Sequence, residues 1–312
     1  MNAEIVIFSG DAHPVLADEI CSHLSVPRAV VRTTRFANDC LQVQLQANCR
    51  ERDVYLIQPL VPPVQENLVQ LLLMADAARG ASAARVTAVM SHYAYARSDK
   101  KDAPRISIGG RLVADLLVTA GVNRVLTLTL HSPEVHGFFS VPVDHLHALR
   151  ELAAHFGQRD LSRAVVLSPD LGYAKSAAQF ARRLGVPVAA GAKERFSDSR
   201  VSISAIIGEV ADRDVIIVDD EIARGTTVIE LLSVLRRQEV RSISIACTHG
   251  LFADGALEKL AAAEDVMEIV CTNSVPVPLS HPKLTVLSVA PALAEAIRRT
   301  HDGQSVSVLF EH

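Results

Sequence analysis

The strongest constraint on the fold is a regular alternation of short β-branched segments with longer stretches of helical period. This alternation predicts parallel strands joined by crossover helices, because parallel neighbours cannot be joined by a tight turn. The crossover helices cover both faces of such a sheet, so its strands are apolar on both faces. We therefore expect an α/β fold of parallel sheets flanked by helices.

The alternating pattern occurs twice along the 312 residues, a length that suits two cores of about 150 residues each. In the first series we predict strands at 4–8, 53–58, 85–90 and 124–129 and helices at 14–23, 64–78 and 109–119. In the second series we predict strands at 164–168, 186–190, 215–219, 242–248, 266–271 and 284–289 and helices at 174–184, 227–238 and 256–263. The join falls near 146–158. We therefore expect two similar domains, 1–147 and 148–312, and the last residues could also pack on the first domain.

Composition and charge exclude several classes of protein. Apolar residues make up 49% and charged residues 21%, which is typical of a globular chain and excludes a disordered one. The formal charge is −4 and no segment concentrates Lys and Arg, so we expect no nucleic-acid partner. The N-terminus lacks a basic leader, and no apolar stretch reaches the roughly 18 residues that span a bilayer. We expect no membrane partner and a cytoplasmic location, where the five cysteines stay reduced.

The strongest local signal is the segment 215–227, in which an apolar strand ends in Asp219 and Asp220 and a Gly/Thr turn opens a helix. Unpaired main-chain amides at a helix N-terminus, aided by the hydroxyls of Thr226 and Thr227, form a ready site for a phosphate. The two carboxylates can accept hydrogen bonds from the vicinal hydroxyls of a ribose ring. In the alternative interpretation, the acids and Thr227 cap the sheet edge and the helix without any ligand.

This segment resembles the phosphoribosyl-binding loop that type I phosphoribosyltransferases share with ribose-phosphate pyrophosphokinases. Further segments, in the same order along the chain, resemble the pyrophosphokinase family alone: 10–17, 93–100, His131 with 137–145, 168–170 and 193–195. A simple base phosphoribosyltransferase lacks the whole first domain. The resemblance implies two domains of the type I phosphoribosyltransferase-like fold.

The resemblance also implies the reaction, in which the 1-hydroxyl of ribose 5-phosphate attacks the β-phosphorus of ATP and AMP leaves. It assigns the sugar phosphate to Asp219, Asp220, Ala223, Arg224, Gly225, Thr226 and Thr227. It assigns ATP to Phe36, Asn38, Cys40, Arg97, Ser98 and Asp99, and Mg²⁺ to His131 and Asp170. Lys193 and Arg195 occupy the positions at which the family places cations against the transferring group.

Several positions depart from the family pattern, mostly on the nucleotide side. Asn38 and Cys40 replace two acids, Ser98 a glutamine, Thr129 an acid, Tyr173 a glycine, Ser176 an arginine, Ala223 an acid and Arg224 a threonine. These changes keep two alternatives open: a weakened homologue that acts as a regulatory or associated subunit, and a kinase or transferase on another phosphorylated sugar. The resemblance further implies a homo-oligomer built from dimers, up to a hexamer, because Phe36 matches an aromatic that stacks on adenine in a neighbouring subunit.

Overall fold

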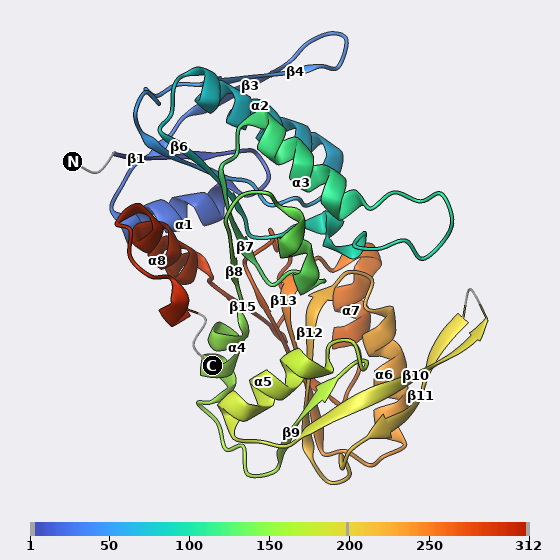
Figure 1. The fold of residues 1–312 in the computed structure, drawn as a ribbon. Helices are drawn as coiled ribbons and strands as arrows, with labels where there is room; N and C mark the ends of the chain where they lie inside the picture. Colours follow the sequence, from blue (N-terminus) through green and yellow to red (C-terminus); the bar gives the residue numbers. More distant parts are fainter. Residues whose placement is uncertain (1–3, 198–199, 310–312) are drawn as a thin grey trace. The chain divides into compact units, whose positions relative to one another are not determined.

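The structure is a computed structural model that describes residues 4–197 and 200–309 (Figure 1). The described chain divides into two compact units. The first unit contains the described residues up to 147 together with 274–276 and 289–309, and the second contains 148–273 and 277–288, apart from 198–199. Each unit is a sheet covered by helices, and each is considered by itself below.

The first unit is built on a six-stranded parallel sheet in the order β2-β1-β5-β6-β7-β8. Its strands are β1 (Ile5–Ser9), β2 (Arg28–Ala29), β5 (Asp53–Ile57), β6 (Arg85–Met90), β7 (Arg124–Leu128) and β8 (Val143–Leu146). The helices are α1 (Pro14–Leu24), α2 (Val64–Gly80), α3 (Gly109–Ala120) and α8 (Ala290–His301), with short 3-10 turns η1 (Ala94–Arg97), η2 (Pro133–Phe138) and η4 (Ser307–Leu309). An antiparallel hairpin, β3 (Val31–Arg35) and β4 (Leu41–Leu45), completes the unit.

Two helices cover each face of the first sheet. Leu71 and Met74 of α2 and Val113 of α3 share one buried cluster with Val54 and Leu56 of the central strand β5. On the opposite face α8 packs beside α1, and the Tyr55 hydroxyl lies 3.3 Å from the Ile297 carbonyl (Figure 1). Successive side chains of a strand point to opposite faces of the sheet, so Tyr55 faces α8 whereas its neighbours Val54 and Leu56 face α2 and α3.

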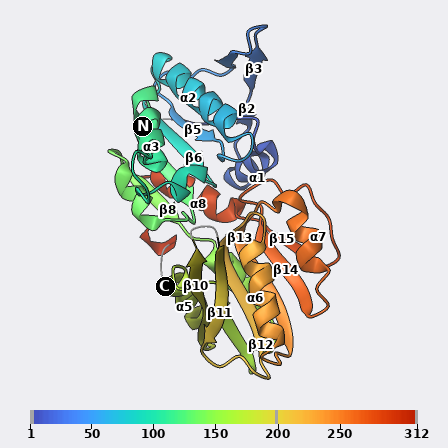
Figure 2. The ribbon, with the colours of Figure 1, turned by 90° about the vertical axis from the view of Figure 1, so that its right-hand side faces the viewer.

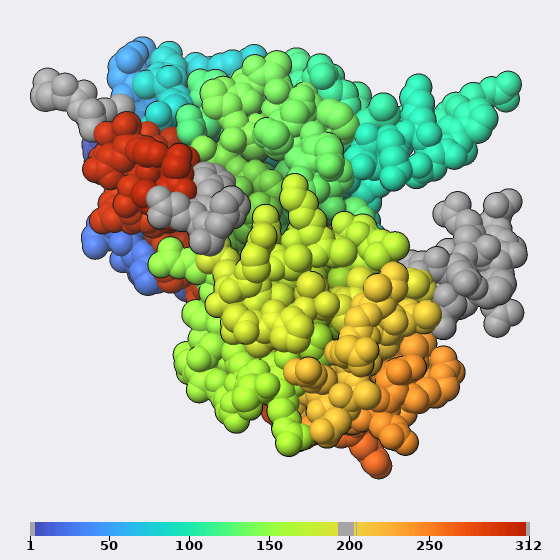
Figure 3. Space-filling model, turned by 60° about the horizontal axis from the view of Figure 1, so that its bottom comes forward, coloured from blue at the N-terminus to red at the C-terminus, as the bar shows by residue number. Residues whose placement is uncertain are grey.

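The buried carboxylate of Asp53 connects α8 to the first sheet. α8, near the end of the chain, packs beside α1, near its start (Figure 3). Asp53 is 3% exposed and accepts hydrogen bonds from the Arg85 Nε, at 2.8 Å, and from the Tyr55 hydroxyl, at 3.0 Å. His301 Nδ1 of α8 lies 2.8 Å from the same carboxylate. Burying a charge is tolerated only with such a full set of partners.

We predict that Asp53→Ala lowers the free energy of unfolding by about 3 kcal/mol, because it leaves the partners of a buried carboxylate unpaired. Urea denaturation measures this difference. Asp18→Ala is the matched control, since Asp18 forms an exposed ion pair with Arg28 at 2.5 Å that contributes at most about 1 kcal/mol. Equal losses in the two variants would contradict the anchoring role of Asp53.

The second unit is built on a seven-stranded sheet in the order β11-β10-β9-β12-β13-β14-β15, of which only β11 runs antiparallel to its neighbour. Its strands are β9 (Ala164–Ser168), β10 (Val188–Ser197), β11 (Arg200–Ile207), β12 (Asp214–Ile222), β13 (Ser242–Gly250), β14 (Val266–Thr272) and β15 (Leu284–Leu287). Its helices are α4 (Leu149–Phe156), α5 (Ala174–Leu184), α6 (Thr226–Arg236) and α7 (Ala256–Ala261), with the 3-10 turn η3 (Ala253–Gly255). Figure 2 shows α6 lying against this sheet beside β11 and β12.

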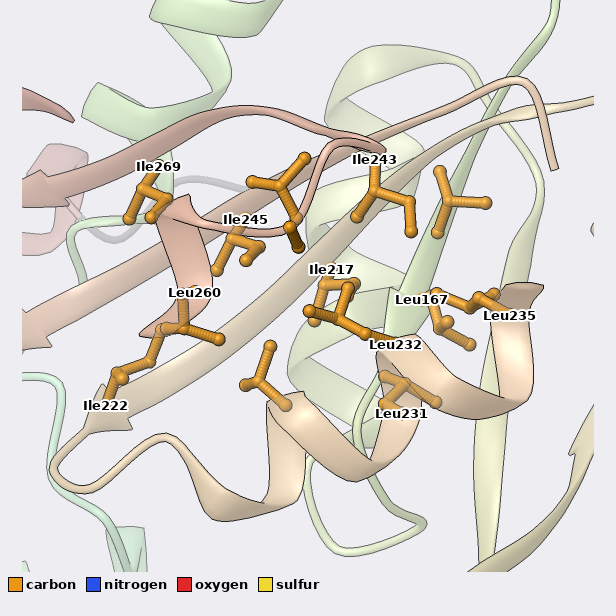
Figure 4. Close-up of a cluster of buried hydrophobic side chains, with 14 of the residues drawn as sticks. Leu167, Ile217, Ile222, Leu231, Leu232, Leu235, Ile243, Ile245, Leu260 and Ile269 are labelled. Carbon is orange, nitrogen blue, oxygen red and sulfur yellow. The ribbon is translucent and has the colours of Figure 1, made fainter. Parts of the chain in front are cut away.

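Successive residues of the central strand β12 pack into different cores. Ile217 contacts a cluster that includes Leu231 and Leu232 of α6 (Figure 4). Its neighbours Ile216 and Val218 belong to a second cluster, formed with α4 and α5. Fully buried parallel strands require apolar residues on both faces, which explains the unbroken run Val215–Val218.

The structure adds elements that the sequence pattern did not predict. The region 146–158, interpreted as a join, contains α4, which begins the second unit. The hairpin β3–β4, the part of β10 beyond residue 190, the strand β11 and the edge strands β2 and β8 were also missed. Among the described residues, no helix is both long enough and apolar enough to span a membrane.

Candidate functional site

Three neighbouring strands bring the candidate residues of the second unit to one edge of its sheet. β9 lies between β10 and β12, and all three are parallel, so their carboxyl ends meet. The chain leaves β9 through α5 to reach β10 on one side, whereas β12 lies on the other side. The direction in which strands are added to the sheet therefore reverses between β9 and β12. In open α/β sheets, ligands bind at such a reversal, beyond the carboxyl ends of the strands.

The loop after β12 leads directly into α6. Gly225 adopts a left-handed conformation, with φ of 69°, at the position before the helix. No described side chain caps the first turn of α6, so the amides of Thr226 and Thr227 keep their hydrogen-bonding capacity. A helix start of this kind suits a phosphate, because the amides and the helix dipole both favour negative charge.

The segment 252–254 contacts residues 222–224, at the end of β12 and just after it. The Ala253 amide donates to the Ala223 carbonyl at 2.8 Å, and the Phe252 amide donates to the Ile222 carbonyl at 3.1 Å. Arg224 Nε forms an ion pair with Asp254 Oδ2 at 2.8 Å. The two backbone hydrogen bonds hold residues 222 and 223 against this segment, whereas the ion pair joins two exposed side chains and contributes little. The contacting residues lie about 30 positions along the chain, and the sequence contained no signal for them.

The acid pair at the end of β12 is held in a shared, water-poor environment. The Asp220 amide donates to Asp219 Oδ1 at 2.9 Å, and Asp220 is 4% exposed. Burial, followed by the nearby Asp220 carboxylate, raises the pKa of Asp219 well above its ordinary value. Two adjacent carboxylates favour one retained proton, or a ligand that supplies positive charge or hydroxyl donors.

We predict that Asp219→Asn stabilises the free protein at neutral pH, because the folded state of the natural protein holds an Asp219 proton that the unfolded state has lost. Between the unfolded-state pKa and the raised folded-state pKa, the folded state binds more protons, so stability falls as pH rises. The gain in melting temperature of Asp219→Asn should therefore grow between pH 4 and pH 8.

The exposed Asp160 provides a control of opposite sign. Its pKa is lowered, chiefly by the Ser162 amide that donates to it, so its contribution to stability is present above the unfolded-state pKa and is lost as pH falls. Asp160→Asn should not stabilise the protein at neutral pH. A gain for Asp219→Asn that does not change with pH would contradict the burial of its charge.

Asp170 lies in the tight loop that follows β9. The Ser168 hydroxyl donates to the Asp170 carbonyl at 2.6 Å, and Asp170 Oδ1 accepts a hydrogen bond from the Tyr173 amide at 3.1 Å. A side chain at Gly191 of β10 would come within 2.6 Å of the Pro169 carbonyl, so only glycine permits this close approach. The strand order thus places the Asp170 loop between β10 and the acid pair of β12.

Lys193 and Arg195 lie in β10, where their backbones pair with Ile203 and Val201 of β11. The register shifts between Ala192 and Lys193, so the strand is irregular where the candidate cations begin. The side chains of Lys193 and Arg195 lie outside the part of the structure that is described.

The candidate nucleotide residues belong to two elements of the first unit. Phe36, Asn38 and Cys40 form the turn of the β3–β4 hairpin, in which Phe36 is 48% exposed and the Cys40 amide donates to Asn38 Oδ1 at 3.3 Å. Arg97, Ser98 and Asp99 follow β6 at the end of η1. The Ser98 hydroxyl oxygen accepts a hydrogen bond from the Gly109 amide at 2.8 Å, which joins this turn to the start of α3.

The candidate metal ligands belong to different units, His131 to the first and Asp170 to the second. His131 is exposed just beyond β7, and Thr129 before it is buried in a left-handed conformation, with φ of 42°. Across residues 4–197 and 200–309, no three His, Cys, Asp or Glu side chains form a metal-binding group. Of the two, Asp170 offers the carboxylate oxygen that Mg²⁺ prefers, and this ion is usually held by one or two carboxylates together with substrate phosphates.

Two protein-family models match this chain, one in its first half and one in its second. Residues 5–121 match the family described as the N-terminal domain of ribose phosphate pyrophosphokinase, and residues 197–311 match the phosphoribosyl synthetase-associated domain. A Streptomyces coelicolor protein provisionally named ribose-phosphate pyrophosphokinase is 70% identical over 99% of this chain and 98% of its own. The Deinococcus radiodurans ribose-phosphate pyrophosphokinase is 49% identical over 98% of each chain.

The crystal structure of phosphoribosylpyrophosphate synthetase from Mycobacterium smegmatis is similar to the whole molecule. It is 36% identical, covers 96% of this chain and 99% of its own, and superimposes with a TM-score of 0.91. The fold class expected from the sequence, parallel sheets flanked by helices in two parts, is confirmed by this similarity.

Proposed function

Because this chain belongs to the ribose-phosphate pyrophosphokinase family, we propose that it transfers the β,γ-diphosphoryl group of ATP to the 1-hydroxyl of ribose 5-phosphate. The products are phosphoribosyl pyrophosphate and AMP. The family resemblance inferred from the sequence is confirmed. The observation that carries the proposal is the acid pair Asp219 and Asp220, followed by an uncapped helix start beside the loop of Asp170.

The sugar phosphate binds at the loop after β12. The 5-phosphate accepts hydrogen bonds from the amides of Thr226 and Thr227, and the acid pair accepts hydrogen bonds from ring hydroxyls. The raised pKa of Asp219 supports this assignment, because hydroxyl donors relieve the repulsion between the two carboxylates. Arg224 adds a cation to the same loop.

ATP binds through the hairpin turn and the turn after β6. The exposed ring of Phe36 offers a stacking surface for adenine, and Arg97 offers a planar fork for phosphate oxygens. Asn38, Cys40, Ser98 and Asp99 complete this proposed site. His131 of the first unit and Asp170 of the second would each offer a ligand to Mg²⁺, and this ion would supply neutralising charge to the substrate phosphates.

The chain's own contribution to the transfer is positioning and charge stabilisation. Diphosphoryl transfer needs little covalent help, so the decisive residues hold the 1-hydroxyl near the β-phosphorus and stabilise the charge that spreads over the transferring group. We assign the second role to Lys193 and Arg195, which lie on the strand next to the Asp170 loop.

Two further features belong to the proposal. An adenine-stacking residue on an exposed hairpin suits a site shared between subunits, so we propose a homo-oligomer built from dimers, up to a hexamer. We also propose a cytoplasmic location, where ATP and reduced thiols are both available.

The activity is tested by incubating the pure protein with ATP and Mg²⁺ in the presence and absence of ribose 5-phosphate. AMP should form only when the sugar phosphate is present, and unphosphorylated ribose should not replace it, because it lacks the group that binds at α6. Binding of ribose 5-phosphate without any AMP would instead support a regulatory subunit. AMP formed with another sugar phosphate but not with ribose 5-phosphate would support a different kinase or transferase.

We predict that Arg195→Ala lowers kcat/KM about 100-fold, the usual loss when one electrostatic donor to a transition state is removed. Arg237→Ala removes an exposed arginine at the end of α6 and should leave kcat/KM within about twofold. Steady-state AMP release measures both variants. Full activity in Arg195→Ala would remove this residue from the mechanism.

A further inference from the structure

Tyr173 is an unusual residue in the candidate site because its large side chain occupies a position at which the related family usually has glycine. It immediately precedes α5, and its ring packs against the buried cluster that includes Val218 and Ala246. Val218 is the residue directly before the acid pair of β12. The ring therefore extends from the Asp170 loop toward the carboxyl end of the neighbouring strand.

The Tyr173 hydroxyl is fully buried, and within the described part of the chain it has no hydrogen-bond partner. An unsatisfied hydroxyl in the interior is destabilising, and each such group calls for a physical explanation. A phenol hydroxyl can donate a hydrogen bond, and Tyr173 packs against the cluster that includes Val218, the residue directly before the acid pair.

The backbone amide of Tyr173 is held by Asp170, the acid in the loop after β9. The Tyr173 amide donates to Asp170 Oδ1 at 3.1 Å, and the Tyr173 carbonyl accepts from the Ala177 amide at 3.0 Å as the first turn of α5 begins. Tyr173 therefore links the loop after β9 to the cluster that includes Val218, the residue before the acid pair. Its position is set by the fold before any ligand arrives.

We propose that Tyr173 is a specificity-determining residue whose hydroxyl forms a hydrogen bond with a ring hydroxyl of the bound pentose phosphate, alongside Asp219 and Asp220. This inference rests on the proposed function, because it names a further contact in the same sugar site. A hydroxyl of the bound sugar forms the hydrogen bond that the Tyr173 hydroxyl lacks in the free protein. The unpaired Tyr173 hydroxyl destabilises the free protein, and this hydrogen bond removes that penalty when the sugar is bound.

The test compares Tyr173→Phe, which removes only the hydroxyl, with the natural protein. KM for ribose 5-phosphate should rise about fivefold to tenfold, the loss expected for one hydrogen bond. KM for ATP should stay within about twofold. Calorimetric titration with ribose 5-phosphate should show the same loss of affinity.

Thermal unfolding separates this role from a structural one, because the melting temperature of free Tyr173→Phe should rise by about 2–4 °C when an unsatisfied buried hydroxyl is removed. Tyr55→Phe is the matched control: its hydroxyl already donates to Asp53 at 3.0 Å, so this variant should melt lower and keep its KM for ribose 5-phosphate. A weaker affinity together with a higher melting temperature is the expected signature of Tyr173→Phe.

An unchanged KM for ribose 5-phosphate in Tyr173→Phe overturns the inference, whatever the melting temperature. A lower melting temperature with equal losses for both substrates also overturns it, since that result indicates a structural residue. If the natural protein neither binds nor uses ribose 5-phosphate, the proposed function itself fails, which the assay of the natural protein reveals first.

Discussion

The candidate site depends most on two adjacent carboxylates, Asp219 and Asp220, near the end of the buried strand β12. Asp219 and Asp220 follow the apolar run Val215–Val218, so the strand that carries them is rigid and its position is set by packing on both faces. Because a water-poor environment disfavours two adjacent negative charges, the free protein keeps a proton on Asp219, which costs stability at neutral pH. The buried hydroxyl of Tyr173 is a second unfavourable group, and we propose that the hydroxyls of a bound sugar relieve both. Strain of this kind in a free protein is typical of a site shaped for its ligand.

The neighbouring elements follow from this constraint. β9 lies beside β12 and ends in the loop of Asp170, and β10 lies beside β9 and carries Lys193 and Arg195. Three residues separate β12 from α6, and the η3 loop contacts that connection through Ala253 and the pair of Arg224 with Asp254. The residues proposed to bind the sugar, the phosphate and the transferring group thus lie on β12, at the start of α6 and on β10.

Most of the fold was predictable because its strands are buried on both faces and its helices are long. Such segments carry their signal in their own composition, as β6, β9 and α5 illustrate with bounds identical to those expected. Two of the missed strands are short, since β2 has two residues and β8 four. The hairpin strands β3 and β4 alternate exposed and half-buried residues, a pattern of half-buried strands that differs from the fully apolar runs on which the predicted strands rest. The candidate residues were found through local order along the chain. Contacts made across the fold, such as Asp53 with His301, left no pattern in the sequence. The surroundings of the Tyr173 hydroxyl were equally invisible, because they depend on packing between α5 and β12.

The central claim is that a pentose phosphate binds with its ester group at the start of α6 and its ring at the acid pair. A crystal structure of the protein with ribose 5-phosphate tests it most directly. We expect the phosphate within hydrogen-bonding distance of the amides of Thr226 and Thr227, and a ring hydroxyl on Asp219 or Asp220. A sugar phosphate bound elsewhere, with the α6 amides facing only solvent at saturating ligand, would contradict the account.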